Sequence, residues 1–204
     1  MKRIILTVAA LAAIITGGVA AAAPAMASPN PNSVIKVTSQ AQLDNLVAQG
    51  NGTIAKNIDV PANAEQGIWL SWTHVAGNIT VEGQLTMASD NIDGNVTVSG
   101  PGSFLGLTNQ ATHIHGNLTV QGSSGVYQGG PGTMSFGNWT QYPGADLSTA
   151  VSQVDGGLTL INNSGGLYVG YPMHVSGGFT YTGNTGPVLD RGGLNVDGQQ
   201  VVSG

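Results

Sequence analysis

Histidine and aspartate recur at fixed positions before a repeated glycine. His74, His113 and His174 each stand three residues before such a glycine, and Asp93 and His115 stand one residue before one. If strands stack rung on rung, His113 and His115 face one side about 6.5 to 7 Å apart, and Asp93 lies one rung from His115, about 4.8 Å away. Imidazole and carboxylate groups at this spacing can bind a divalent metal or form a pH-sensitive patch.

The predicted metal ligands are therefore His113, His115, Asp93 and His74. The alternative is a row of solvated polar side chains at a turn. A divalent metal is the only cofactor that the sequence indicates.

The glycines belong to a repeat that supplies the strands. Gly77-Asn-Ile-Thr-Val returns as Gly94-Asn-Val-Thr-Val and Gly116-Asn-Leu-Thr-Val, and fainter copies begin at Gly137, Gly156, Gly177 and Gly192. Successive copies are 15 to 22 residues apart. Self-similarity at such a period predicts a solenoid.

Alternation within each copy points the apolar residues inward and the Asn and Thr residues outward. This register predicts one inward stack, consisting of Ile79, Val96, Leu118, Trp139, Leu158, Phe179 and Leu194. Second strands follow another glycine at 83–85, 102–104, 125–127, 166–168 and 186–188, and a third short strand precedes each new copy. We predict an all-β, single-domain right-handed parallel β-helix of about seven to eight coils. An antiparallel sandwich or barrel is the alternative.

The N-terminal residues have the pattern of a signal peptide. Lys2 and Arg3 precede an apolar run, and Ala25-Met26-Ala27 fits the small-residue rule for cleavage. We expect a signal peptide at 1–27, a flexible leader at 28–33, the β-helix domain at 34–204, and a secreted, extracellular protein without a membrane anchor after cleavage.

One short helix is predicted at about 40–49. Ser39 and Gln42 have the spacing of a capping box, and Gly50 supplies the stop. Such a helix would cover the open end of the solenoid.

The segment from Val37 to Ile54 resembles the start of secreted right-handed parallel β-helix proteins of the pectate-lyase-like class. The resemblance implies the fold. Lyases of that class use a basic residue beside calcium-binding acids, and the hydrolases use neighbouring carboxylates. Here Arg191 is the only basic residue of the coils, and Asp90 with Asp93 makes a small acidic pair. A non-catalytic protein is favoured, and a small polysaccharide-acting lyase or hydrolase is the alternative.

After cleavage, Lys36, Lys56 and Arg191 would face ten acidic residues. This balance excludes nucleic acid and anionic membranes as partners, because phosphate binding needs basic clusters. The chain has no cysteine, so disulfides cannot contribute to its stability.

We expect a binding or structural module at the cell surface, acting on a glycan or another cell-envelope component. Aromatic rings and a column of hydroxyls are the candidate ligand-binding groups: Tyr142, Tyr168, Tyr171, Thr80, Thr97 and Thr119. The threonine column also admits ice binding as an alternative. The matching column Asn78, Asn95, Asn117 and Asn138 predicts an amide ladder, with glycosylation as its alternative.

The C-terminal residues of the sequence predict a contact between molecules. Val201 and Val202 follow the final copy without an evident cap. An uncovered rung offers backbone groups to another chain, so end-to-end self-association is a further expectation.

Overall fold

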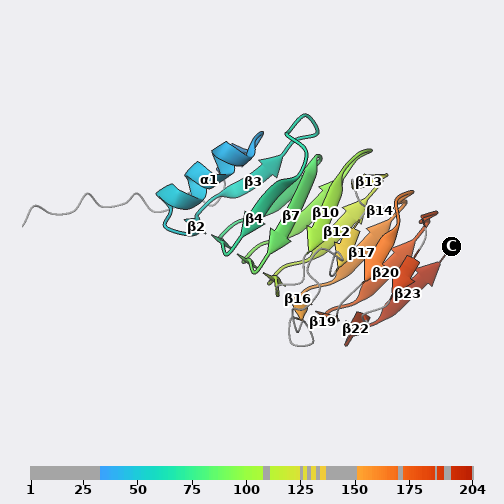
Figure 1. The fold of residues 1–204 in the computed structure, drawn as a ribbon. Helices are drawn as coiled ribbons and strands as arrows, with labels where there is room; N and C mark the ends of the chain where they lie inside the picture. Colours follow the sequence, from blue (N-terminus) through green and yellow to red (C-terminus); the bar gives the residue numbers. More distant parts are fainter. Residues whose placement is uncertain are drawn as a thin grey trace, which may run out of the picture.

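The computed structural model describes residues 33–107, 111–124, 126–127, 130–131, 134–136, 151–169, 172–186, 188–190 and 194–203. Within these residues the chain forms a parallel β-solenoid with one short helix at one end (Figure 1). No helix among them is long and apolar enough to cross a membrane. The predicted signal peptide and most of the leader lie outside the described residues.

Three parallel sheets form the solenoid, and each coil contributes one strand to each. Sheet 1 contains β1 (Val34–Lys36), β3 (Asn57–Val60), β6 (Ile79–Val81), β9 (Val96–Ser99), β12 (Leu118–Gln121), β17 (Leu158–Ile161), β20 (Phe179–Thr182) and β23 (Gln200–Ser203). Sheet 2 contains β4 (Ile68–Ser71), β7 (Gln84–Ala88), β10 (Phe104–Leu107), β15 (Met134–Phe136), β18 (Leu167–Val169) and β21 (Val188–Asp190). Sheet 3 contains β2 (Thr53–Ile54), β5 (His74–Val75), β8 (Asn91–Ile92), β11 (His113–Ile114), β16 (Ser152–Val154), β19 (Met173–Val175) and β22 (Leu194–Val196).

The chain visits sheets 1, 2 and 3 in that order in every coil, and the strands of these sheets pair in parallel. The predicted parallel solenoid is therefore confirmed, and the antiparallel alternative is wrong. In the described part, the six strands of sheet 2 mark six complete coils, with incomplete coils at both ends, where seven to eight coils were predicted.

The inward stack of sheet 1 holds the fold together. Ile79 pairs with Val96, Val96 with Leu118, Leu118 with Leu158, and Leu158 with Phe179. All five side chains are buried. Each buried aliphatic side chain contributes about 1.5 to 3 kcal/mol relative to an exposed one. The stack thus supplies cohesion to a chain that has no cysteine and therefore no disulfides.

One predicted member of this stack is wrong, and another, Trp139, lies outside the described residues. Leu118 pairs directly with Leu158, so sheet 1 has no rung between these two residues. Leu194 belongs to sheet 3, where it pairs with Met173. The last strand of sheet 1 is β23 instead, and it pairs with β20.

The coil that begins at β12 is longer than the others. The strand predicted at 125–127 does not join sheet 2. There, β13 (Val126–Tyr127) pairs antiparallel with β14 (Gly130–Pro131), and β15 takes the place between β10 and β18. Alternation looks alike in a coil strand and in a local hairpin, so the sequence pattern alone could not separate them.

The helix α1 (Gln40–Gln49) begins and ends where the sequence predicts. Ser39 Oγ accepts a hydrogen bond from Gln42 N, while Gln42 Oε1 accepts one from Thr38 N, one residue earlier than in a capping box. Leu43 is buried against the core. The helix lies at the N-terminal end of the solenoid (Figure 1), near β2 and β4.

The glycine that opens each copy is needed because neighbouring rungs lie close together at this turn. A Cβ atom at Gly94 would lie 2.6 Å from the carbonyl oxygen of Gly77, with similar clashes at the corresponding glycines. Other glycines are needed for a different reason: Gly100 and Gly102 have positive φ angles, of 92° and 88°, which residues with a Cβ atom rarely adopt.

Candidate metal centre

The outward surface of sheet 3 alternates between histidine rungs and aspartate rungs. The shared column of the three histidines is confirmed: His74 pairs with Asn91, Asn91 with His113, His113 with Gln153, and Gln153 with His174. Met134 and Leu189, which stand at the same spacing before Gly137 and Gly192, lie on sheet 2 and are not part of it. The two outward residues of successive rungs are His74 and Ala76, Asn91 and Asp93, His113 and His115, Gln153 and Asp155, His174 and Ser176, and Asn195 and Asp197. Every second rung thus carries an amide followed by an aspartate.

Each histidine of the column contacts the aspartate of the following rung. His74 Nε2 lies 3.0 Å from Asp93 Oδ2, and His174 Nε2 lies 2.8 Å from Asp197 Oδ2. His113 Nε2 lies 2.9 Å from Asp155 Oδ2. In each case the aspartate stands two residues after the residue that pairs with the histidine in the next rung. This diagonal contact therefore occurs three times in the described residues.

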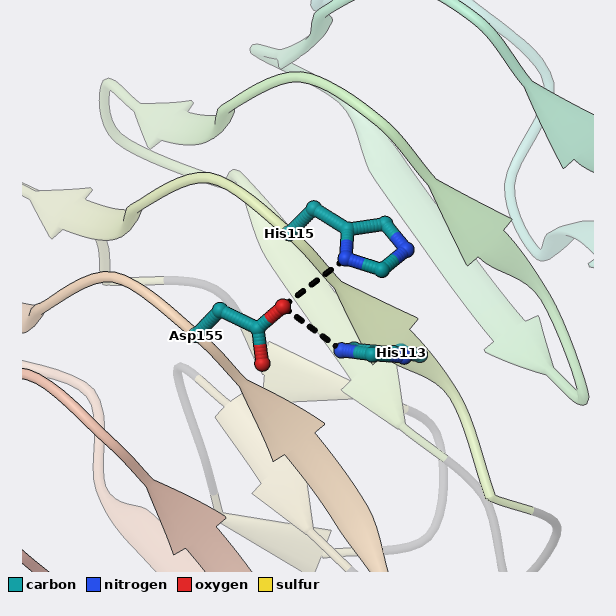
Figure 2. Close-up of side chains that lie close together, drawn as sticks. All are labelled: His113, His115 and Asp155. Atoms are coloured by element: carbon teal, nitrogen blue, oxygen red, sulfur yellow. Dashed lines mark hydrogen bonds and ion pairs between the residues drawn. The ribbon is translucent and has the colours of Figure 1, made fainter.

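The middle contact contains a second histidine. His115 Nδ1 lies 2.8 Å from the same Oδ2 atom of Asp155, so both imidazoles converge on one carboxylate oxygen (Figure 2). The two rings are 3.9 Å apart between centroids and tilted by 44°. One potential ligand atom from each of the three residues lies within 4.8 Å of the other two. We call His113, His115 and Asp155 the triad.

Asp155 is held in place by a fourth residue. Gln153 Nε2 donates a hydrogen bond of 2.6 Å to Asp155 Oδ1, which leaves Oδ2 directed at the histidines. The pKa of Asp155 is lowered to about 2, chiefly by His113; burial opposes this effect, and hydrogen bonds from His115 and Gln153 add to it. The carboxylate is therefore ionised at any neutral pH.

His113 Nε2 is a buried nitrogen that lacks a well-directed hydrogen bond, although Asp155 Oδ2 lies 2.9 Å away. Buried polar atoms in native proteins normally have a hydrogen-bond partner. A cation between the rings and the carboxylate would satisfy this atom.

The ligand types and their spacing fit zinc. Zinc takes nitrogen at about 2.0 to 2.1 Å and carboxylate oxygen at about 2.0 to 2.2 Å in tetrahedral geometry, which places neighbouring ligand atoms about 3.3 Å apart. The two contacts to Asp155 are 2.8 and 2.9 Å, so small side-chain rotations would admit the ion. The side chains are 35 to 40 % exposed, although the Nε2 atom of His113 is itself buried.

The predicted ligand set is divided between two clusters. His113 and His115 lie together as expected, and Asp93 does occupy the rung before His115, but its carboxylate turns to His74. Asp155, in the rung after, contacts His115 instead. The sequence pattern did not predict Asp155 as a ligand, because counting the copy at Gly137 as a coil separated Asp155 from His115 by one additional rung. Without that copy, the alternation of histidine and aspartate rungs is visible in the sequence.

The other predicted ligand-binding residues are spread over the surface. Thr80, Thr97 and Thr119 form the expected half-buried column on sheet 1, which Thr159 and Thr180 continue. Tyr168 lies on β18, and only its backbone is described. Tyr142, Tyr171 and Arg191 lie outside the described residues.

The amide ladder is confirmed beside the threonine column. Asn57 Oδ1 accepts a hydrogen bond from Asn78 N, Asn78 Oδ1 from Asn95 N, and Asn95 Oδ1 from Asn117 N. Asn117 Oδ1 then accepts one from Gly157 N. Asn138 lies outside the described residues. The ladder thus ties each turn to the next.

The expected acidic pair of Asp90 and Asp93 does not form. Asp90 is buried at a corner, where it accepts hydrogen bonds from Thr73 N at 2.9 Å and Ala88 N at 2.8 Å. Burial raises the pKa of Asp90 to about 7, against the lowering effect of these bonds. Asp90 stabilises the corner between sheets 2 and 3, whereas Asp93 lies on the outer surface of the solenoid.

The chain matches no protein-family model, no curated protein and no solved structure. The resemblance to pectate-lyase-like proteins is therefore supported only at the level of the β-solenoid fold.

Proposed function

We propose that this protein is a secreted, non-catalytic binding module that holds a divalent transition metal, with zinc as the best fit, at the triad. The observation that carries the proposal is the convergence of His113, His115 and Asp155 on one point of a rigid sheet. Secretion rests on the signal-peptide pattern of residues 1–27.

The chemistry of the triad favours zinc over calcium or magnesium. Calcium and magnesium prefer sites made of oxygen ligands, whereas neutral imidazole suits zinc, copper, nickel and iron. Gln153 fixes the carboxylate from behind, and such outer partners commonly orient metal ligands. Strand β11 holds His113, and the turn directly after it holds His115, so both imidazoles are already placed side by side before an ion binds.

A binding role is favoured over catalysis by the placement of the acids. Asp90 is enclosed and bonded to backbone groups, and Asp93 is engaged with His74. Among the described residues, neither lies beside a second free carboxylate, as a hydrolase would require. These contacts give no support to the polysaccharide-acting enzyme.

Calorimetric titration of zinc into the purified protein at pH 7.5 tests the proposal. We expect one equivalent of zinc to bind the wild-type protein and no comparable binding to the His115→Ser variant. The His174→Ser variant is the matched control, because it removes a histidine of the same column from a two-residue contact. Absence of binding heat in the wild type, or equal loss in both variants, would exclude the triad as the site.

A further inference from the structure

Two tryptophans lie exposed at the helix-covered end of the solenoid, far along the chain from the triad. Trp69 is 42 % exposed on β4, the edge strand of sheet 2, and Trp72 is 74 % exposed at the turn that follows. Tryptophan is normally largely buried, so exposure of two indoles within four residues needs a reason.

The backbone at Trp72 adds to this observation. Its φ angle is 53°, in the left-handed region that aromatic residues rarely occupy. The turn one rung above uses Ser89 with a φ angle of 58°, so the conformation belongs to the turn itself and not to the tryptophan. A large aromatic residue stands where glycine or asparagine would suit the backbone better, and such outliers cluster at functional sites.

A groove of about 310 Å³ opens beside Trp69, between α1 and β4. This size lies at the lower end of the range of ligand pockets. Its floor is apolar and includes the buried residues Leu43 and Leu70, and its rim is polar. The lining residues are Gln40, Leu43, Asp44, Val47, Ala48, Trp69, Leu70, Ser71 and Thr73.

Backbone pairing with another strand is prevented at this edge. Gln40 Oε1 accepts a hydrogen bond from Trp69 N at 2.7 Å, and Gln40 Nε2 donates one to Trp69 O at 2.9 Å. The side chain of Gln40 thus occupies the positions that an added strand would use. A partner at this groove must therefore contact the side chains that line it and not add a strand to β4.

We infer that the groove binds a neutral glycan. The C–H face of a sugar ring packs on the exposed indole of Trp69, because those hydrogens carry a partial positive charge and the ring face a negative one. Asp44 and Ser71 on the rim supply hydrogen-bonding groups for hydroxyls. Trp72 directly follows the lining residue Ser71 in the chain, and its exposed indole provides a second platform for the next sugar unit.

The charge around the groove selects against acidic sugars. Asp44 lines the groove, and the carboxylate of Glu65 lies at the start of α1, where its Oε2 accepts a hydrogen bond from Gln40 N. No basic side chain lines the groove. A polyuronate such as pectate would be repelled by these two carboxylates, whereas an uncharged polysaccharide would not.

Affinity electrophoresis of the purified protein in gels that contain a soluble β-glucan, a galactomannan or polygalacturonate tests the inference. We expect retardation by a neutral polymer, at least about 10-fold weaker binding for Trp69→Ala, and a smaller loss for Trp72→Ala. The control variant Val202→Ala changes an exposed apolar residue at the other end and should behave as the wild type.

Thermal unfolding of each variant checks that it is folded, and EDTA should leave the retardation unchanged, which separates this site from the triad. The inference is wrong if no neutral polymer retards the protein, if only polygalacturonate does, or if Trp69→Ala binds as well as the wild type. A dimer in sedimentation that Trp69→Ala abolishes would assign the groove to a second copy instead.

Discussion

The triad and the two simpler contacts on sheet 3 differ by one side chain. His74 with Asp93 and His174 with Asp197 repeat the contact of His113 with Asp155. Where the triad has His115, the other histidine rungs have Ala76 and Ser176. A single position therefore separates two potential ligands from three. Because two exposed ligands bind a metal weakly, we expect zinc only at the triad.

The largest expected effect comes from building a second triad. Ser176 occupies in its rung the position of His115, and His174 already lies 2.8 Å from Asp197. The Ser176→His substitution should raise the zinc stoichiometry from one to two equivalents per chain, measured by calorimetry. The Thr180→His variant, which adds a histidine on sheet 1, should remain at one. A stoichiometry of one equivalent for Ser176→His would contradict the hypothesis that a histidine at the position of His115 is sufficient to create a zinc site.

The reverse change should convert the triad into a simple contact. His115→Ser leaves His113 and Asp155 in place, as His174 and Asp197 are now. We expect zinc affinity to fall by at least about 100-fold, because even outer partners of metal ligands contribute 10- to 100-fold. Competition with a chelating dye measures this change. Retention of wild-type affinity would show that His115 is not a ligand.

Gln153 offers a finer test, because it contacts only the carboxylate. Its Nε2 atom donates to Asp155 Oδ1 at 2.6 Å, and Gln153→Leu removes this bond while keeping a similar side-chain volume. Zinc affinity should decrease by about 10-fold or more. Asn195→Leu changes the corresponding residue beside Asp197 and should leave zinc binding as it is. Equal effects of the two substitutions would point to a general loss of surface polarity.

The smallest effect concerns stability without metal. The pKa of Asp155 is lowered from 3.8 to about 2 in the folded protein, so the stabilisation it provides is present above pH 3.8 and is lost as the pH falls towards 2. Urea unfolding between pH 2 and 5 should show a shallower loss of stability for Asp155→Asn than for the wild type. Asp90 has the opposite effect: because its pKa is raised, the stability of the folded state decreases as the pH rises from 3.8 to about 7. Asp90 is present in both the wild type and the variant, so its effect cancels in the comparison. Parallel curves for the two proteins would contradict the prediction.

Local patterns predicted the parts of the fold that depend on local chemistry. The helix at 40–49 follows from Ser39 and Gly50, and the pairing of Ile79, Val96 and Leu118 follows from strict alternation. The shared column of His74, His113 and His174 follows from the same register. These predictions held because one-residue slips would expose the whole apolar face.

Long-range pairing could not be predicted in the same way. The copies at Gly137 and Gly192 have the correct residue types, yet sheet 1 continues from Leu118 to Leu158 and ends with Gln200–Ser203. Whether a segment stacks depends on the neighbour that it meets, which a local motif does not encode. Asp155 was missed for this reason, since its partner His115 is 40 residues away in sequence.

The long coil gives the triad a mechanical consequence. His113 lies on β11, His115 directly follows it, and Asp155 follows β16, 40 residues after His115 in the sequence. An ion bound by all three would therefore join the rungs at the two ends of this long coil. The entropic cost of bringing two chain segments together increases with the number of residues between them. An ion that binds only the folded state would offset part of this cost. The zinc concentration around the protein would then determine how tightly this coil is closed, and with it how long the protein survives proteolysis.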